Sequence, residues 1–429
     1  MLTLTRPETA ALLQEAEAAL RSGAFESAVE HSAMAIAADP KNGRAHFING
    51  QAHLSAKNFS AAERAYKKAI ELGFTPAACY FGLGAAQSVS GYYSAAVKQY
   101  TLALGQSGCT DALRLEIYHQ LALLHIELGD FAAALRWFGK EETVPVPNAH
   151  MSESLGHMLS IHAAAGETQA ALLCVGQLLV LHPEDWLYHH IKINLLIQSG
   201  TPQALTDAAD ALKKAEAFCT APALQQEHLA DAALLESALA EQEQDPAAAA
   251  ARFEEAIRLL QRAAAVPGTD AAVRAGHELA AAELMLRQEQ KEQALACAVA
   301  VAHRDTLPAE VRAHAAFLAA ELLFALGREA EAAACVPLLK AAAAGQYKNH
   351  GMYLAWRLAG GAAEKQRAYQ LAEAQLRKAA AEHDPTAMIY RIKLAAEAKD
   401  FARARRLLKS VAPALAAELE EYITRCEEE

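Results

Sequence analysis

The sequence predicts an all-α fold in which antiparallel helix pairs stack into a solenoid. The first observation is a period: a break in the helical pattern recurs every 34 residues, at Gly23, Lys57 and Gly91. The second is that aromatic residues and alanines follow each break at constant offsets: Phe25, Phe59 and Tyr93, then Ala28, Ala62 and Ala96, then Ala35, Ala69 and Ala103. A fixed period of this length without a strand pattern is typical of stacked helical hairpins.

The third observation is the composition. Hydrophobic residues make up 53% of the chain, whereas aromatic residues make up only 6%. Alanine-rich helices that pack closely fit these values better than a globular core of large side chains. In a repeat array each unit packs on its neighbours, so the 429 residues measure a number of hairpins rather than of globular domains. We expect about eleven hairpins.

Two kinds of residue mark the expected helix ends. Prolines separate one helix pair from the next, because proline cannot continue a helix; they are Pro40, Pro76, Pro145, Pro147, Pro183, Pro222, Pro267, Pro308 and Pro385. A second break divides each interval into a helix A and a helix B. In the first half of the chain it falls where the left-handed conformation can end a helix: Gly23, Lys57 with Asn58, Gly91, Gly129 with Asp130, Gly166 and Gly200.

The breaks of the second half are spaced less evenly. They fall at Asp245 with Pro246, Gln288 to Gln290, Gly327, Gly360 with Gly361, and Lys399 with Asp400. We therefore expect helix pairs of variable length there. Pro337 and Pro413 fall inside predicted B helices and should kink or split them.

Two further segments modify the predicted array. Gly129 lies 38 rather than 34 residues after the preceding break, so an insertion around residues 107–111 should lengthen a helix or a connection. The acidic segment from Leu415 to Glu429 should form a capping helix with a polar outer face. The basic run from Arg391 to Lys409 should pair with this acidic end rather than with a separate acidic partner.

This pattern resembles the tetratricopeptide repeat (TPR) family. The best copy covers residues 77–110, with Tyr80, Leu83 and Gly84 on helix A, Gly91 and Tyr93 at the turn, and Ala96, Tyr100 and Ala103 on helix B. Small residues at two of these positions let the helices approach, and tyrosines fill the gaps beside them. The resemblance implies a right-handed superhelical solenoid. We expect a regular array over residues 1–202, hairpins of longer period over 203–345, and C-terminal hairpins with the capping helix over 346–429.

Charge, cysteines and hydropathy exclude several classes of function. The formal net charge of −12 disfavours nucleic acid as a partner. Seven scattered cysteines without a C-x-x-C pair favour the reducing cytoplasm. Residues 1–8 do not resemble a signal peptide, and no apolar stretch is long enough to span a bilayer. We expect a cytoplasmic protein without a membrane partner.

The seventeen histidines suggest a metal site at first sight. Histidines that share an ion on one helix are three or four residues apart, whereas gaps of six, seven and five separate His119 from His125, His150 from His157, and His157 from His162. His53, His125 and His162 also occupy the position on helix A where the TPR family usually has tyrosine. We interpret them as packing residues, and no metal site is predicted.

Enzyme motifs are incomplete. Gly82-Leu83-Gly84 begins like a dinucleotide-binding fingerprint, but Gln87 stands where the third glycine should be. Gly139-Lys140 lacks the upstream glycine of a phosphate-binding loop. Neither G-x-S-x-G nor H-E-x-x-H occurs. We expect no catalytic residue, no cofactor and no enzymatic activity.

The groove along the A helices is the remaining candidate site, since the resemblance implies that ligands bind there. Helical spacing predicts which residues of the regular copies face it: Leu13, Glu17, Arg44, Phe47, Gln51, Phe81, Ala85, His119, Leu123, Ser160, His190 and Asn194. Apolar anchors among scattered polar groups suit an extended or helical peptide.

We interpret the chain as a non-enzymatic scaffold or adaptor that binds a partner protein or peptide in this groove. Two alternatives stay open. One is a chaperone for secretion or assembly cargo, because the stretch from Tyr80 to Gly84, with Gly91 to Tyr93, is similar to the short TPR chaperones of type III secretion. The other is a peptide-responsive regulatory receptor. The oligomeric state is not predicted.

Overall fold

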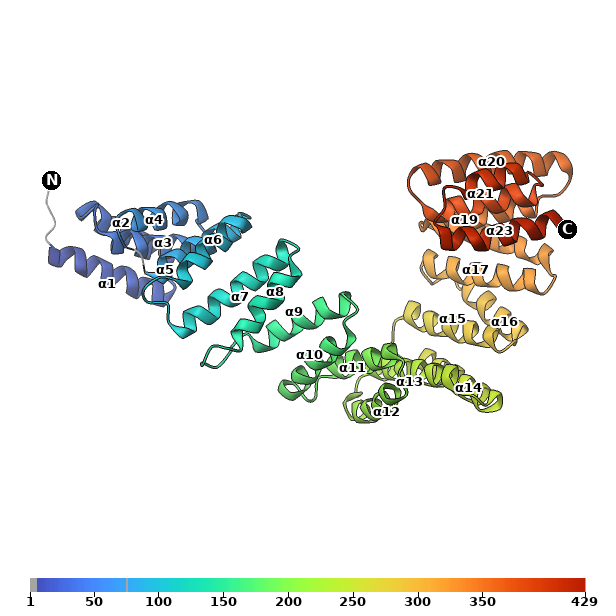
Figure 1. Ribbon diagram of the computed structural model, residues 1–429, viewed down its shortest axis with the longest axis horizontal. Helices are drawn as coiled ribbons and strands as arrows, with labels where there is room; N and C mark the ends of the chain where they lie inside the picture. The colour runs from blue at the N-terminus through green and yellow to red at the C-terminus, as the bar shows by residue number, and fades with distance from the viewer. Residues whose placement is uncertain (1–5, 75, 429) are drawn as a thin grey trace. The chain divides into compact units, whose positions relative to one another are not determined.

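The computed structural model describes residues 6–74 and 76–428, in which helices are joined by short connections. Contacts between residues divide the chain into two compact units, of which unit 1 ends at Pro183 and unit 2 begins at Glu184. Within each unit the helices stack in chain order (Figure 1). The boundaries expected at residues 202 and 345 stay a prediction. Residues 1–5 of the N-terminal segment, and Glu429, lie outside the described residues.

Unit 1 consists of five helix pairs. Its A helices are α1 (Arg6–Ser22), α3 (Gly43–Ser55), α5 (Ala77–Val89), α7 (Asp111–Glu127) and α9 (Met151–Ala164). Its B helices are α2 (Phe25–Ala38), α4 (Phe59–Glu71), α6 (Tyr93–Leu104), α8 (Phe131–Glu141) and α10 (Thr168–Leu181).

Unit 2 consists of six helix pairs and a final helix. Its A helices are α11 (Trp186–Ser199), α13 (Pro222–Gln242), α15 (Ala271–Arg287), α17 (Ala309–Ala325), α19 (Gly345–Arg357) and α21 (Pro385–Glu397). Their partners are α12 (Pro202–Ala215) with the 3₁₀ turn η1 (Glu216–Phe218), α14 (Pro246–Ala264), α16 (Lys291–Ala302), the 3₁₀ helix η2 (Glu329–Cys335) with α18 (Val336–Ala341), α20 (Ala362–Ala381) and α22 (Phe401–Leu408). The last helix is α23 (Pro413–Glu428).

These pairs confirm the predicted all-α solenoid of about eleven hairpins. The breaks predicted in the first half all have positive φ angles, at Gly23 (79°), Lys57 (61°), Gly91 (79°), Gly129 (73°), Gly166 (73°) and Gly200 (64°). The left-handed conformation turns the chain at the end of helix A, so that helix B can return antiparallel to it.

The insertion and the two prolines act as expected. Helix α7 has 17 residues where α5 has 13, so the insertion lengthens a helix. Pro337 lies in the first turn of α18, and the chain before it forms the 3₁₀ helix η2 instead of one continuous B helix. Pro413 begins α23 after α22 has ended at Leu408.

Most of the acidic C-terminal segment lies in helix α23. Helix α23 packs against α21 and α22. Arg405, within the basic run, donates to Glu420 at 2.9 Å and to Glu427 at 2.7 Å. Arg405 thus pairs with the acidic end, whereas Arg391 and Arg403 of the same basic run pair with Glu373 on α20.

Small residues allow close packing between helix A and helix B within the pairs of unit 1. The ring of Tyr66 on α4 is buried, and a Cβ added to Gly50 would lie 2.9 Å from it. A Cβ added to Gly84 would lie 3.0 Å from the ring of Tyr100. The rings of both tyrosines thus occupy space that is open because the facing residue on helix A is glycine. An alanine at that position would close this space.

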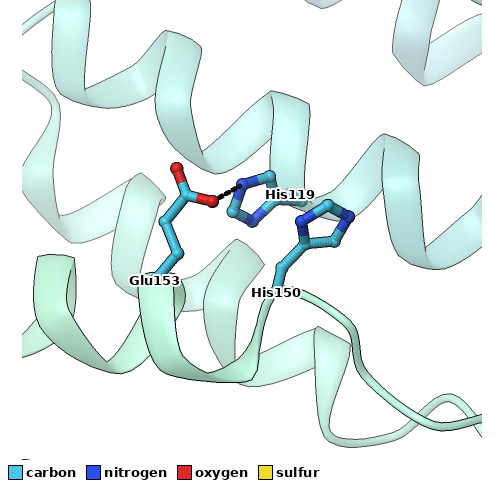
Figure 2. Close-up of side chains that lie close together, drawn as sticks. All are labelled: His119, His150 and Glu153. Carbon is cyan, nitrogen blue, oxygen red and sulfur yellow. Dashed lines mark ion pairs between the residues drawn. The ribbon is translucent and has the colours of Figure 1, made fainter.

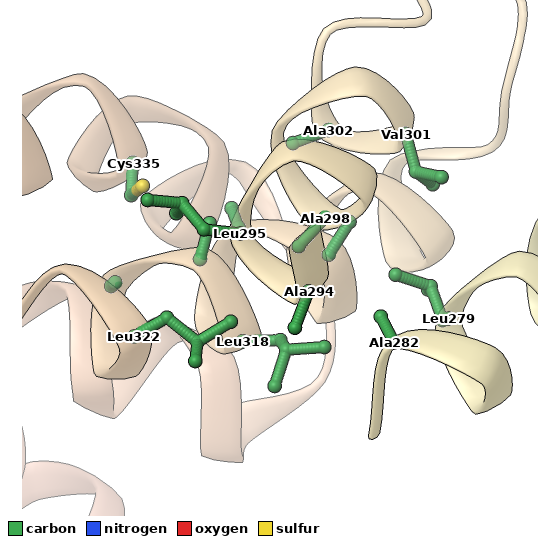
Figure 3. Close-up of a cluster of buried hydrophobic side chains, with 14 of the residues drawn as sticks. Leu279, Ala282, Ala294, Leu295, Ala298, Val301, Ala302, Leu318, Leu322 and Cys335 are labelled. Carbon is green, nitrogen blue, oxygen red and sulfur yellow. The ribbon is translucent and has the colours of Figure 1, made fainter. Parts of the chain in front are cut away.

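A continuous hydrophobic core of unit 2 extends from Ala233 on α13 to Leu394 on α21, and a separate cluster that includes Ile392, Ala404 and Ile423 joins α21, α22 and α23. Figure 3 shows the part of it where α16 lies between α15 and α17. Alanines such as Ala294 and Ala298 bring the backbones together, and leucines such as Leu279 fill the spaces. Smaller clusters join neighbouring helices in the described part of unit 1 from α1 to α8.

Candidate functional site

The A helices of unit 2 enclose a cavity of about 530 Å³ between α11, α13 and α15. Its apolar wall includes Leu234, which is 47% exposed. Its polar wall includes Glu241, Glu283 and Arg287, and Arg287 donates to Glu241 at 2.9 Å. An exposed leucine in a hollow bordered by charged groups is typical of a binding pocket.

A second cavity of about 290 Å³ lies on the next three A helices, α17, α19 and α21. Seven residues line it: His314, Phe317, Gln346, Tyr347, Thr386, Ile389 and Tyr390. Residues three or four apart on one helix share a face, which is why α17 and α21 each contribute several of them. The ring of Tyr347 lies 6.0 Å from those of both His314 and Phe317. The side chains that line this cavity are mainly aromatic, whereas those that line the first cavity include charged groups.

The two cavities are neighbours along the same row of helices. Glu283, which lines the first, has its Oε1 3.4 Å from Nε2 of His314, which lines the second. We call the two cavities together the unit 2 groove. It extends along six consecutive A helices, from α11 to α21.

A buried polar network holds one wall of the second cavity. His350 is 2% exposed, and its Nδ1 lies 2.9 Å from the hydroxyl of Tyr390. Burial, together with the positive charges of Lys393 and Arg357, lowers the pKa of His350 to about 3. The ring is therefore neutral over the physiological pH range, and its hydrogen bond fixes the position of Tyr390.

Two residues predicted from the sequence contact a residue that lines the first cavity. Nδ1 of His190 on α11 lies 2.7 Å from Oδ2 of Asp231, and Asn194 donates to Asp231 at 3.1 Å. Asp231 is buried and lines the first cavity. The hydrogen bond that His190 donates to Asp231 raises the pKa of His190, although burial of the ring opposes this shift.

The predicted apolar anchors of unit 1 pack against neighbouring rings. The ring of Phe47 lies 6.0 Å from that of Tyr66 and 5.4 Å from that of Phe74. The ring of Phe81 lies 5.3 Å from that of Tyr100. Both phenylalanines are half-buried, so part of each ring contributes to packing between helices.

The predicted polar residues of unit 1 separate into two groups. Arg44 is exposed, donates to Glu17 at 2.7 Å, and lines a cavity of about 330 Å³ together with Leu13. His119, by contrast, is 2% exposed, so its ring is enclosed by protein and does not face a groove. The remaining predicted residues that the structure leaves half-buried are Gln51, Ala85 and Leu123, and Ser160 is exposed.

His119 belongs to a cluster that spacing along one helix did not reveal. One ligand atom of each of His119, His150 and Glu153 lies within 4.8 Å of those of the other two. His119 comes from α7, whereas His150 and Glu153 come from the beginning of α9 (Figure 2). Among the described residues this is the group whose donor atoms suit a metal ion.

The surroundings of His119 are strongly polar although buried. Its Nδ1 lies 3.2 Å from Oε1 of Glu141 and 3.2 Å from Oγ of Ser154. Burial alone would lower the pKa of His119, but the hydrogen bond and charge of Glu141, with Glu153 and Glu116, raise it above its usual value. Burial would raise the pKa of Glu141, but hydrogen bonds from His119, Asn148 and Ser154 lower it. Each residue of the pair thus shifts the pKa of the other in the direction that favours an ion pair.

The histidines assigned to packing have the surroundings expected of that role. The side chains of His125 and His162 are 17% and 15% exposed. His125 lies 3.6 Å from Asp130, and His162 lies 2.6 Å from Glu167. Each ring thus has a buried body and a polar edge next to the residue that begins the following B helix.

The residues of the unit 2 groove were missed because the repeat motif fades beyond residue 200. Positions facing a groove were assigned by counting from the regular copies, and no such count reached α17 or α21. The signal that was present is local: His314 with Phe317, and Thr386 with Ile389 and Tyr390, are spaced to share one helix face.

The paired helices, the left-handed breaks and the small residues between helices form a solenoid of antiparallel helix pairs, which is the arrangement found in tetratricopeptide repeats. No protein-family model and no curated protein sequence matches the chain. No helix among the described residues is both long enough and apolar enough to cross a membrane.

Solved structures similar to the chain are TPR proteins. The C-terminal part of a TPR repeat-containing protein from Cytophaga hutchinsonii is 14% identical, covers 58% of this chain and 95% of its own, and has a TM-score of 0.43. PilF of Pseudomonas aeruginosa is 16% identical, with 55% and 98% covered and a TM-score of 0.40. YrrB, described as a TPR protein with an unusual peptide-binding site, is 18% identical, with 44% and 93% covered and a TM-score of 0.36.

Proposed function

We propose that this protein is a non-enzymatic scaffold or adaptor that binds a segment of a partner protein along the A helices. The observation that carries the proposal is the unit 2 groove, in which an exposed leucine, aromatic side chains and charged groups follow one another along six helices. A groove of this kind suits an extended or helical peptide with apolar anchors. His190 and Asn194, which are part of the proposed site, contact Asp231, and Asp231 lines the first cavity.

Unit 1 supplies a second proposed surface. It includes Arg44, Phe47, Gln51, Phe81, Ala85 and Leu123, none of which is fully buried. Arg44 and Gln51 supply the polar groups of this surface. A partner could bind them without disturbing the ring contacts of Phe47 and Phe81. A cytoplasmic location is part of the proposal, and the scattered cysteines favour it. Nucleic acid remains an unfavourable partner because of the net charge of −12.

The experiment compares two leucines of unit 2. Leu234 lines the first cavity and is 47% exposed, whereas Leu371 lies on α20 away from both cavities and is 55% exposed. The full chain would be used to select peptides from a phage-displayed random library. We expect Leu234→Glu to lose at least tenfold in affinity for the selected peptides, and Leu371→Glu to bind them like the unchanged chain.

Circular dichroism checks that both variants keep the same helix content. Equal affinity of the two variants would contradict binding in the unit 2 groove. Loss of binding in Arg44→Ala with Gln51→Ala, while Leu234→Glu still binds, would place the binding surface in unit 1 instead.

A further inference from the structure

The cluster of His119, His150 and Glu153 brings two neighbouring helix pairs of unit 1 together at one point. Nε2 of His119 lies 3.5 Å from Oε2 of Glu153 (Figure 2). The His119 side chain is 2% exposed, whereas that of Glu153 is 55% exposed. A buried nitrogen and an accessible carboxylate thus face each other, so a small ion can reach the site from solvent.

Glu141 sets the orientation of the buried ring. This carboxylate is itself buried, and it accepts hydrogen bonds from Ser154 at 2.7 Å and from Asn148 at 2.9 Å. Held in this way as an acceptor, Glu141 binds Nδ1–H of His119 and leaves Nε2 of the same ring directed at Glu153. A carboxylate that fixes one ring nitrogen while the other faces a ligand position is the usual arrangement around metal-binding histidines.

His150 supplies the second imidazole. Its ring stacks on that of His119, with the centroids 4.1 Å apart and the planes 14° from parallel. Its Nε2 lies 2.9 Å from Oε2 of Glu116, which is on α7 one turn before His119. The lone pair of an imidazole nitrogen lies in the ring plane, so stacked rings do not point at a common ion. A rotation of the His150 side chain, which is 26% exposed, would turn its nitrogen toward the other two ligands.

We propose that His119, His150 and Glu153 bind a divalent transition-metal ion of the zinc class, with Glu141 orienting His119 from behind. Two imidazole nitrogens and a carboxylate suit Zn²⁺ better than Mg²⁺ or Ca²⁺, which prefer oxygen ligands alone. Because its ligands come from α7 and from the start of α9, the ion ties the fourth helix pair to the fifth across the connection between residues 142 and 150. The site is structural in this proposal, and no reaction is assigned to it.

The test titrates the full chain with Zn²⁺ in competition with a chromogenic chelator. His150→Ala and Glu153→Gln remove ligands whose side chains are partly exposed, so both variants should fold. The control is His303→Ala, which removes an exposed histidine of unit 2. We expect one Zn²⁺ equivalent to bind at least tenfold more weakly in each ligand variant, and to bind unchanged in the control.

Thermal unfolding followed by circular dichroism provides a second readout. Zn²⁺ should raise the melting temperature of the unchanged chain and of His303→Ala, and should raise it less in His150→Ala. The same stoichiometry and affinity in the unchanged chain and in both ligand variants would overturn the proposal. Loss of one equivalent in His303→Ala alone would also overturn it, because the ion would then belong to unit 2.

Discussion

Gly82 on α5 faces the ring of Tyr66 on α4, and a Cβ at position 82 would overlap the phenol group. The ring is buried, so it cannot move out toward solvent. Replacement of this glycine therefore tests how tightly the second and third helix pairs are packed.

We predict that Gly82→Ala lowers the free energy of unfolding by about 1–3 kcal/mol, because overpacking outweighs the better helix propensity of alanine. The matched control is Gly176→Ala on α10, where an added Cβ meets nothing within 4 Å; this change should stabilise unit 1 by up to about 1 kcal/mol. Urea denaturation measures both. When Tyr66 is also replaced by leucine, Gly82→Ala should lower the free energy of unfolding by less. An equal loss in both backgrounds would show that the ring of Tyr66 does not cause it.

Lys57 ends α3 in the left-handed conformation, with a φ of 61°. Side chains with a Cβ are disfavoured there, so Lys57→Gly should raise the free energy of unfolding by about 0.5–1 kcal/mol. The same change at Lys98, an exposed residue inside α6, should cost about 1 kcal/mol, since glycine is a poor helix former. Chemical denaturation of the two variants checks the opposite signs, and a loss of stability in Lys57→Gly would contradict the prediction.

The low pKa of His350 makes the stability of unit 2 sensitive to acid. The pKa of this ring is about 3 in the folded chain, against 6.5 when it is exposed. Below pH 6.5 the unfolded chain takes up a proton that the folded chain does not, so the stability present above pH 6.5 is lost as the pH falls. The loss is about 1.4 kcal/mol per pH unit, or about 2 kcal/mol between pH 6.5 and 5.

The variant His350→Gln separates this effect from other titrating groups, because it keeps an acceptor for the hydroxyl of Tyr390 but does not titrate. Urea denaturation at pH 7 and pH 5 should show a larger loss in the unchanged chain than in the variant. An equal loss in both would assign the acid sensitivity to other groups.

Ala96 is fully buried in a cluster with Tyr100 and Leu121. Ala96→Leu should therefore cost about 1–3 kcal/mol of unfolding free energy, because the added volume has no space between α5 and α6. The neighbouring exposed residue Ser94 provides the control, and Ser94→Leu should change stability by less than about 0.5 kcal/mol. Thermal melting distinguishes the two, and equal melting temperatures would contradict tight packing at position 96.

The fold could be predicted largely from the sequence because its signals are local. A left-handed residue such as Gly91 must end a helix wherever it stands, and Pro337 must interrupt a continuous B helix. The number of hairpins followed from counting such breaks. The length of α7 followed from the displaced break at Gly129. None of these inferences needs a contact between distant residues.

The sites could be predicted only in part, because they depend on contacts between hairpins. The distance from His119 to His150 is 31 residues along the chain, and their stacking depends on how α9 follows α7. The burial of His119 beside Glu141 likewise depends on the connection after α8. His190 and Asn194 were found because they lie on a regular A helix, but their partner Asp231 is on the irregular α13.

The continuous core of unit 2 has a consequence for local unfolding. When one helix pair of a stacked array unfolds locally, it exposes the apolar surface of both neighbouring pairs. The free energy of this local unfolding rises with the apolar area that the pair shares with its neighbours. From α13 to α21 that core is unbroken, so backbone amides there should exchange with solvent at similar, slow rates. In unit 1 the smaller clusters should let single hairpins open separately, and their amides should exchange in distinct groups.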